Sequence, residues 1–305
     1  MTDSEWENQF RSWAEPPSKT EQTRCDNAIS AVRNAVSNSE PLKYTTKVFV
    51  QGSYRNRVNV KKDSDVDIGV LYTGSYFLDL LAGGQDPLSG AASYDYASFK
   101  NDLETALRSH FKMGVERGNK AIKLRENTYH VDADVAPLFH LKKFGTYGEF
   151  LRGVSLVPDD GSRRIDNYPE RLADDWPNVP LHYENGVEKN SATSRRYKSA
   201  TRIVKKLCNT MADEGNNAAK VIPGYLIECL IYNAPNSYFG ANSWLELVRS
   251  IFCYIWVETK LEGDCSKWTE VDRIKFLFHS SQPWTKEQAH AFVDTAWDRI
   301  GVKSA

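Results

Sequence analysis

The sequence predicts an α+β fold, in which a lobe of mixed strands and helices precedes a lobe built from helices alone. Two observations indicate this order. Strand-like and helical patterns alternate from residue 18 to about residue 137, whereas helical spacing prevails from residue 191 onward. Between these regions, prolines gather among Asp, Asn and Gly at about residues 157–190, which is typical of an irregular connector. We therefore expect a first lobe at residues 1–165, with an N-terminal helix, and a helical lobe at residues 166–305.

The first lobe is predicted from its elements in chain order. A capping box at residues 18–21 opens a helix that runs to about Val36. Residues 47–50 predict a short strand, and residues 66–70 predict a second one, because apolar residues alternate there with Asp and Gly. A Gly/Ser/Asp-rich loop at residues 73–94 comes next. The last predicted elements are a helix around residues 99–111 and strands at about residues 121–125 and 129–136, the second of which ends at Pro137.

The second lobe is predicted as a set of helices from its apolar spacing. The expected helical spans are residues 194–211, 223–232, 244–260 and 286–300. Ligands commonly bind where two lobes meet, so we expect the active site in the cleft between the lobes.

Composition excludes several classes of protein. The 305 residues include 39 Lys and Arg against 40 Asp and Glu, and a net charge of −1 argues against a protein that coats nucleic acid. The five cysteines are scattered, so neither a disulfide framework nor a zinc ribbon is indicated. The N-terminus lacks the apolar run of a secretory signal, and the apolar stretches are too short to span a bilayer. We therefore expect a cytoplasmic protein without a membrane segment.

The most informative residues lie at the end of the first strand and the start of the second. Asp65 and Asp67 stand two residues apart in a strand pattern, so both side chains leave the same face. Two carboxylates on one surface repel each other unless a cation lies between them, and Mg²⁺ prefers oxygen ligands completed by substrate phosphates. Upstream, Gly52 permits a close approach, and backbone N–H groups with the Ser53 hydroxyl can hold a phosphate. The pattern indicates metal-assisted phosphoryl chemistry.

A third carboxylate is expected if two metal ions are to be held for in-line phosphoryl transfer. The strand pattern at residues 130–135 supplies it, because its apolar residues face one way and its two aspartates face the other. Periodicity alone does not choose between Asp132 and Asp134.

Two features of the second lobe fit a nucleotide. Arg202 and Lys205 belong to a run of six cations within residues 195–206, and their spacing puts them on one helix face, suited to a triphosphate. The alternative is a solvated helix face. Tyr225 is either a core residue or a platform on which a base stacks. The motif of a P-loop ATPase is absent from the sequence.

These motifs resemble those of the polymerase-β-like nucleotidyltransferases, and in particular the cGAS/DncV-like branch that includes the bacterial CD-NTases. The resemblance rests first on residues 48–54, Val-Phe-Val-Gln-Gly-Ser-Tyr, and residues 64–68, Ser-Asp-Val-Asp-Ile. Residues 134–137, Asp-Val-Ala-Pro, are similar to the strand that carries the third aspartate of that family. Residues 202–205 and 222–228 are similar to the segments whose lysine reaches the donor phosphates and whose tyrosine stacks on the base.

The resemblance implies a polymerase-β-like catalytic lobe and a metal-dependent enzyme that makes a cyclic di- or trinucleotide second messenger from NTPs, in CBASS anti-phage defence. It selects Asp134 over Asp132, and it implies two Mg²⁺ or Mn²⁺ ions per active site, held by Asp65, Asp67 and Asp134. The nucleotide-binding residues expected are Gly52, Ser53, Lys205, Tyr225 and Arg202. The resemblance also implies NTP substrates, CBASS regulatory partner proteins and a bacterial cytoplasm. The zinc-binding insertion of animal cyclic GMP-AMP synthase is not found, so DNA sensing through it is not expected.

Two other functions remain open at this point. A nucleotidyltransferase with these motifs could add nucleotides to RNA or to a protein instead of closing a ring. A related chain could also bind nucleotides or partners without catalysis, although the presence of all three carboxylates argues against such a silent module.

Overall fold

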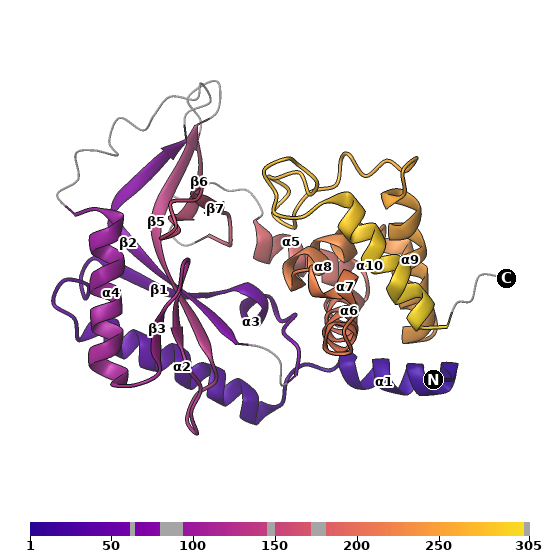
Figure 1. Ribbon diagram of the computed structural model, residues 1–305, viewed down its shortest axis with the longest axis horizontal. Coiled ribbons are helices and arrows are strands. Elements are labelled where there is room, and N and C mark those ends of the chain that lie inside the picture. The colour runs from indigo at the N-terminus through magenta and orange to yellow at the C-terminus, as the bar shows by residue number, and fades with distance from the viewer. Residues whose placement is uncertain (62–64, 80–93, 145–149, 172–180, 302–305) are drawn as a thin grey trace. The chain divides into compact units, whose positions relative to one another are not determined.

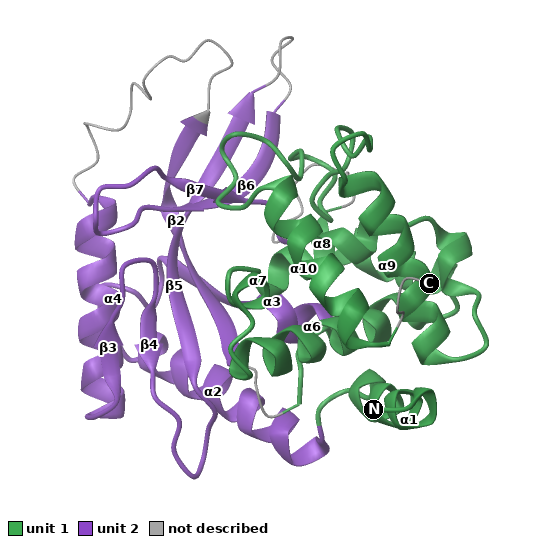
Figure 2. Ribbon diagram, turned by 45° about the vertical axis from the view of Figure 1, so that its right-hand side comes forward, with its two compact units in different colours: residues 1–17, 57–62, 180–305 green, residues 18–56, 63–179 purple. Residues whose placement is uncertain are grey.

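The computed structural model describes residues 1–61, 65–79, 94–144, 150–171 and 181–301 (Figure 1). The chain divides into two compact units (Figure 2). The sheet unit comprises residues 18–56 and 63–179, and the helical unit comprises residues 1–17, 57–62 and 180–305. The predicted α+β class is confirmed.

The sheet unit is built on one mixed sheet. Its strands are β1 (Thr46–Gln51), β2 (Val66–Asp79), β3 (Val115–Arg117), β4 (Ile122–Leu124), β5 (Ala133–Phe144), β6 (Phe150–Leu156) and β7 (Ile165–Asn167). Among the described residues the order is β1-β2-β5-β4-β3, with β6 paired to β5 and β7 paired to β6. β1 lies antiparallel to β2, whereas β2 and β5 are parallel. The parallel pair is central to the site, because both strands carry an aspartate near their starts.

Helices cover this sheet and fix which face of β2 is apolar. They are α2 (Lys19–Ser37), α3 (Gly52–Asn56) and α4 (Tyr96–Phe111). The Ser18 hydroxyl caps α2 by accepting the backbone N–H of Glu21, as the capping box predicts. Helices α2 and α4 pack against the sheet and against each other, and they enclose Val66, Ile68 and Val70 completely. Residues that alternate with these, including the aspartates, therefore leave the opposite face.

The predicted loop at residues 73–94 is partly wrong. Residues 73–79 continue β2, because Tyr76 and Phe77 pair in parallel with His140 and Leu141 of β5. The register shifts between Tyr72 and Tyr76, and such an irregularity hides the strand from a simple period-two pattern. Residues 80–93 of the predicted loop lie outside the described residues.

The prediction that Pro137 ends a strand is also wrong. β5 begins at Ala133, later than expected, and runs through Pro137 to Phe144. Proline lacks a backbone N–H, which usually excludes it from the middle of a sheet. In the described part of the sheet, β4 pairs with β5 only up to Val135, and β6 pairs with it only from Phe139. Pro137 therefore lies where β5 changes neighbours, and no ladder partner is lost on that side.

The helical unit is organised around one long helix. Its helices are α1 (Asp3–Ala14), α5 (His182–Ala192), α6 (Arg196–Asp213), α7 (Asn217–Lys220), α8 (Gly224–Asn233), the 3₁₀ helix η1 (Asn236–Phe239), α9 (Trp244–Thr259) and α10 (Lys286–Arg299). The four helical spans predicted for this part of the chain correspond to α6, α8, α9 and α10. Helix α6 contacts α1, α5, α7, α8, α9 and α10, and its apolar residues form the centre of the core.

Residues 1–17 pack with the helical unit, whereas the expected lobe boundary at residue 165 assigns them to the first lobe. Trp6, Phe10 and Ala14 recur every four residues on one face of α1, and all three are buried in the core that α6 and α9 share. Glu7 fixes the contact by accepting the backbone N–H of Leu245 at 2.9 Å. The helix that begins after Ser18 is the one that belongs to the sheet unit.

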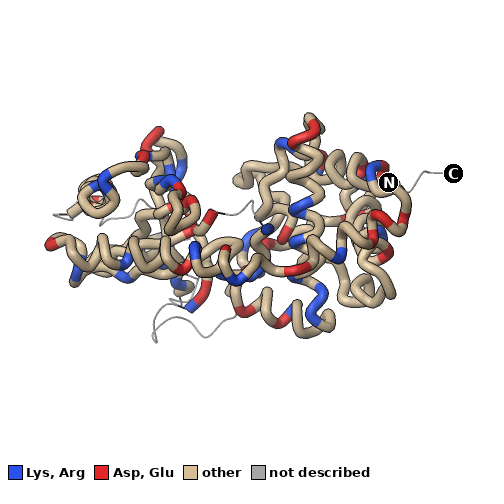
Figure 3. The backbone as a smooth tube through the Cα atoms, turned by 90° about the horizontal axis from the view of Figure 1, so that it is seen from below, with Lys and Arg blue, Asp and Glu red and all other residues tan. Residues whose placement is uncertain are grey.

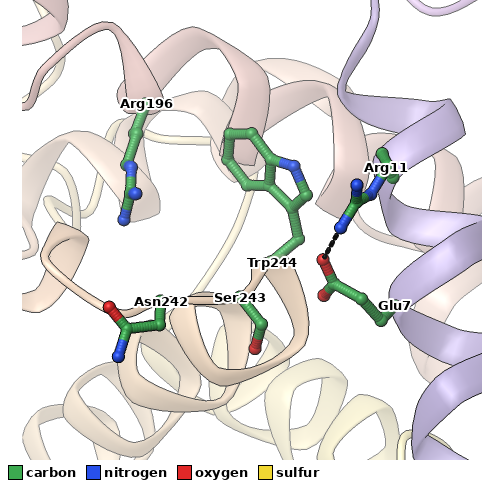
Figure 4. A pocket seen from close by; sticks show the side chains of 6 residues that line it. All are labelled: Glu7, Arg11, Arg196, Asn242, Ser243 and Trp244. Carbon is green, nitrogen blue, oxygen red and sulfur yellow. Dashed lines mark hydrogen bonds and ion pairs between the residues drawn. The ribbon is translucent and has the colours of Figure 1, made fainter.

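A pocket of about 270 Å³ lies beside the contact between α1 and α9 (Figure 4). It is lined by Glu7, Arg11, Arg196, Asn242, Ser243 and Trp244. Glu7 also forms an ion pair with Arg11 at 3.3 Å, and Arg196 donates to the carbonyl oxygens of Phe239, at 3.0 Å, and Ala241. The charged side chains around this pocket therefore hold helices and a loop together.

Charge is distributed evenly over the described chain. Figure 3 shows Lys and Arg interspersed with Asp and Glu along the backbone, which agrees with the net charge of −1. Within the described residues, no helix combines the length and the apolar character that crossing a membrane requires.

Candidate active site

The turn between β1 and α3 brings Gly52 against an aspartate. β1 ends with Gln51 in register with Asp67 of β2, so the next residue turns away beside that carboxylate. Gly52 has a φ of +66°, a conformation that glycine adopts at low cost. A Cβ atom at this position would lie 2.7 Å from the Asp67 Cγ atom, and nearer still to its Oδ2 atom. Only glycine fits here, and Ser53 follows, partly exposed, in the first turn of α3.

The register of the sheet brings two of the predicted carboxylates together. Asp67 of β2 pairs with Asp134 of β5 in the parallel ladder, and neighbouring strands lie about 4.8 Å apart. Both residues are partly buried, while Asp65, just before β2, is exposed. The structure therefore gathers Gly52, Asp67 and Asp134 at one edge of adjoining strands, with Asp65 two residues before Asp67.

The electrostatics of this edge are unfavourable without a cation. Burial raises the pKa of Asp134, and the negative charge of Asp65 raises it further. Lys123, which faces Asp134 from β4, and Arg125 oppose this shift. The charges of Asp65 and Asp134 are therefore close enough to repel each other.

Asp132, the alternative left open by periodicity, has a different environment. It precedes β5, and its Oδ1 atom accepts the backbone N–H of Glu126. Its carbonyl oxygen accepts the N–H of Val66 at 3.1 Å. Asp132 thus closes a turn and joins two strands, whereas Asp134 lies in register with Asp67.

The donor set fits a hard divalent cation. Asp65, Asp67 and Asp134 offer only carboxylate oxygens, which are the ligands that Mg²⁺ and Mn²⁺ prefer. Within the described residues, no group of three His, Cys, Asp or Glu side chains is close enough to hold a metal ion as it stands. The three aspartates are therefore more open than a preformed metal site. An open arrangement of this kind suits ions that share their ligands with substrate phosphates.

Arg202, predicted to bind a triphosphate, is buried among backbone carbonyls. Its Nε atom donates to Ala14 at 2.9 Å, its Nη1 atom donates to Arg57 at 2.7 Å, and its Nη2 atom reaches the Ser199 hydroxyl at 2.9 Å. The guanidinium therefore joins α6 to the last turn of α1 and to the segment of residues 57–62. This geometry supports a structural role.

Lys205, from the same helix, is also buried, but it meets a carboxylate. Its Nζ atom lies 3.5 Å from Glu228 Oε2, and His182 Nε2 lies 2.9 Å from the other oxygen, Oε1. Burial alone would raise the pKa of Glu228, but His182 and Lys205 together lower it to about 2. The Glu228 carboxylate is therefore ionised at neutral pH and joins α5, α6 and α8.

Both the ring and the hydroxyl of Tyr225 have partners. Its ring stacks on His182, with ring centres 5.5 Å apart and an interplanar angle of 26°. Its hydroxyl donates to Glu270 Oε2 at 2.7 Å, and Gln282 donates to the other oxygen of Glu270 at 2.7 Å. Part of the Tyr225 residue remains accessible. The structure thus links Tyr225 to Lys205 through His182 and Glu228.

Comparison with known proteins decides the family. Residues 184–301 match the C-terminal helical domain of cGAS/DncV-like nucleotidyltransferases. A cyclic dipyrimidine nucleotide synthase CdnE from Legionella pneumophila is 42% identical over 97% of this chain and 98% of its own. The chain belongs to the cGAS/DncV-like nucleotidyltransferases.

Two solved structures resemble this nucleotidyltransferase along almost its whole length. One is Elizabethkingia meningoseptica CdnE cyclic dinucleotide synthase with GTP and Apcpp, which is 33% identical, with a TM-score of 0.79 over 97% of this chain and 98% of that chain. The other is Rhodothermus marinus CdnE c-UMP-AMP synthase with Apcpp and Upnpp, which is 27% identical, with a TM-score of 0.79 over 100% and 99% of the two chains.

Local patterns in the sequence of this nucleotidyltransferase do not identify the contact between His182 and Glu228. The six histidines have no spacing typical of a metal site. One signal was available for Glu228, which is the only charged residue of the otherwise apolar helix α8. A charge in such a helix is rarely buried unless it has a partner. The partner His182 comes from a separate helix, and no local pattern identifies it.

A buried carboxylate gives the nucleotidyltransferase a measurable pH dependence. Burial, with the charge of Glu270, raises the pKa of Asp272 from its ordinary 3.8 to about 6. The folded state therefore binds a proton at the Asp272 carboxyl more tightly than the unfolded chain does. The stabilisation of the fold by this proton is complete below about pH 4 and is lost as the pH rises through 6. Relative to Asp272→Asn, the wild type should lose about 3 kcal/mol of unfolding free energy over this range. Urea denaturation of both proteins at several pH values measures the difference, and parallel pH profiles would contradict the assignment.

Proposed function

We propose that this nucleotidyltransferase makes a cyclic dinucleotide from two NTPs and releases two pyrophosphates. The observation that carries the proposal is the pairing of Asp67 with Asp134 in adjacent strands, beside the Gly52 turn. The family supports nucleotidyl transfer, and the names of the relatives support cyclisation of two nucleotides.

Each residue of the site has a proposed role. Gly52 and Ser53 hold the donor triphosphate, while Asp65 and Asp67 hold two Mg²⁺ or Mn²⁺ ions. Asp134 completes the ligands on the acceptor side and accepts the proton of the attacking hydroxyl, a task that suits a carboxyl with a raised pKa. Bound divalent ions supply Lewis-acid activation of the hydroxyl and neutralise the leaving pyrophosphate.

The chemistry is the same in both halves of the reaction. The acceptor hydroxyl attacks the α-phosphorus, the bond to the bridging oxygen of the β-phosphate breaks, and pyrophosphate leaves. Repetition of the step within the linear dinucleotide closes the ring. For the donor nucleotide, we propose that Lys205 contacts the phosphates and Tyr225 stacks on the base, with about 1–3 kcal/mol from stacking.

We further propose pyrimidine NTPs as substrates. The relative named a cyclic dipyrimidine nucleotide synthase is 42% identical, compared with 33% and 27% for the CdnE structures solved with GTP and Apcpp or with Apcpp and Upnpp. The biological setting that fits such a product is a bacterial cytoplasm, with the product serving as a second messenger in CBASS anti-phage defence alongside regulatory partner proteins.

A reaction with all four NTPs tests the proposal. Purified enzyme with Mg²⁺ or Mn²⁺ should convert UTP, CTP or both into a phosphatase-resistant product whose mass equals that of a cyclic dinucleotide. EDTA should stop the reaction, because the three carboxylates then have no cation to share. Mass spectrometry identifies the bases, and digestion with linkage-specific nucleases identifies the bonds.

Other outcomes would replace the proposal. Label in RNA or protein would indicate transfer to a macromolecule. Saturable NTP binding with unchanged NTP pools would indicate a silent nucleotide-binding module. A cyclic product built from purines alone would retain the enzyme class and overturn the proposed base preference.

A further inference from the structure

We propose that Glu228 is a positioning residue, which holds the Lys205 ammonium and, through His182, the Tyr225 ring in the arrangement that binds the donor nucleotide. The inference rests on the proposed function, because the nucleotide-binding roles of Lys205 and Tyr225 belong to that proposal. It goes further by assigning a task to a residue that touches neither the phosphates nor the base.

Both oxygens of the Glu228 carboxylate have partners inside the helical unit. Its side chain is 4% exposed, and its two oxygens meet Lys205 Nζ at 3.5 Å and His182 Nε2 at 2.9 Å. An ionised carboxylate has no proton to give, so His182 Nε2–H is the donor of that hydrogen bond. Three helices, α5, α6 and α8, therefore meet at one buried negative charge.

The ammonium of Lys205 has N–H groups that Glu228 does not bind. An ammonium has three N–H groups, and Glu228 is the one acceptor recorded for them among the described residues. The lysine stem lies along the first turn of α8, since a Cβ atom at Gly224 would be 3.5 Å from its Cε atom. The buried carboxylate thus sets the direction of the ammonium and leaves two N–H groups for an anionic ligand.

His182 links the Glu228 carboxylate to the ring of Tyr225. Its Nε2 atom is fixed by Glu228, and its ring face stacks on Tyr225. Trp284 lies against Tyr225 with ring centres 6.0 Å apart, and Glu270 binds the Tyr225 hydroxyl at 2.7 Å. One carboxylate therefore orients the side chain proposed for the phosphates and the side chain proposed for the base.

Glu228→Gln isolates the charge, because glutamine has the same shape and still accepts the His182 N–H. Without its anion, the buried Lys205 ammonium turns toward water and loses its direction. Binding of non-hydrolysable UTP and CTP analogues with Mg²⁺, measured by calorimetry, should weaken about tenfold for the analogue that the wild type binds. We expect kcat at saturating NTP to fall less than about threefold, since the reacting atoms keep their own ligands.

A double-mutant cycle shows whether the effect passes through the lysine. Lys205→Met removes the ammonium at similar length and should weaken binding about thirtyfold. Adding Glu228→Gln to that variant should weaken binding no further, because the carboxylate then has no ammonium to direct. Glu228→Asp keeps the charge one methylene short and should lose about threefold, and it carries the test if the glutamine variant is unstable.

Asp272→Asn is the matched control. Asp272 is as buried as Glu228 and lies in the same unit, but no contact with Lys205 is recorded for it in the described chain. This variant should bind the analogues within twofold of the wild type. Equal weakening in the control, additive losses in the cycle, or wild-type affinity in Glu228→Gln would each overturn the inference. A wild type that binds neither analogue would overturn the proposed function together with it.

Discussion

Asp65→Ala/Asp67→Ala is expected to reduce product formation at least about 1,000-fold while the protein remains folded. The double change removes two of the three carboxylates proposed to hold the cations, and loss of a single charge-stabilising group typically costs about 100- to 1,000-fold. Asp65 is exposed and its charge repels that of Asp134, so its removal relieves repulsion in the folded state. Product by mass spectrometry and a thermal melt by circular dichroism measure the two effects separately.

Asp132→Ala and Asp134→Ala complete this test as a matched pair. Asp134 lies in register with Asp67, and its loss should be nearly as severe as the double change. Asp132 accepts the Glu126 N–H in a turn, so its loss should cost about 1 kcal/mol of stability and at most a few-fold in rate. Activity that survives Asp134→Ala but not Asp132→Ala would reverse the assignment.

Gly52→Ala is expected to reduce the rate at least about 100-fold with only a modest loss of stability. An added Cβ atom cannot share space with the Asp67 carboxylate, whose Cγ atom would be 2.7 Å away, so that carboxylate must move. A misplacement of about 1 Å at a reacting centre can cost about 100-fold. The φ of +66° adds about 1 kcal/mol of backbone strain for alanine. Steady-state kinetics and urea denaturation measure the two contributions.

Gly161→Ala separates the effect of backbone strain from the effect of a steric clash with the Asp67 carboxylate. Gly161 lies in the same unit with a φ of +73°, and a Cβ atom there would meet nothing within 4 Å. This variant should lose about 1 kcal/mol of stability and retain its rate. Equal kinetic losses in the two variants would show that backbone strain alone, and no displaced carboxylate, explains the effect of Gly52→Ala.

Local patterns predicted the parts of this site that depend on neighbours in sequence. The prediction that Asp65 and Asp67 share a face follows from strand geometry, which repeats every two residues, although β2 begins only at Val66 and Asp65 precedes it. The same rule cannot distinguish Asp132 from Asp134, because both satisfy it. The choice depends on the register between β2 and β5, which is set by the apolar core beneath them.

The different surroundings of Arg202 and Lys205 also depend on contacts between residues far apart in the sequence. Arg202 and Lys205 lie three residues apart on one helix, and the sequence makes them equivalent cations. Their partners differ, because one meets backbone carbonyls of residues 14 and 57 while the other meets the carboxylate of Glu228. Those partners are 23 to 188 residues away in the chain, which only the tertiary fold determines.

Residues 57–62 belong to the helical unit, although the sheet unit lies directly before and after them in the sequence. The polypeptide passes from one unit to the other after residues 17, 56, 62 and 179, so neither unit is a continuous stretch. Val58 and Val60 are buried, and the backbone at Arg57 is secured by Arg202. A fragment that ended at residue 165 would lose the arginine that secures this segment, directly after the helix that carries Gly52 and Ser53. The turn of Gly52 and Ser53, which is proposed to bind phosphate, therefore depends, through six residues of connecting chain, on helices encoded more than one hundred codons downstream.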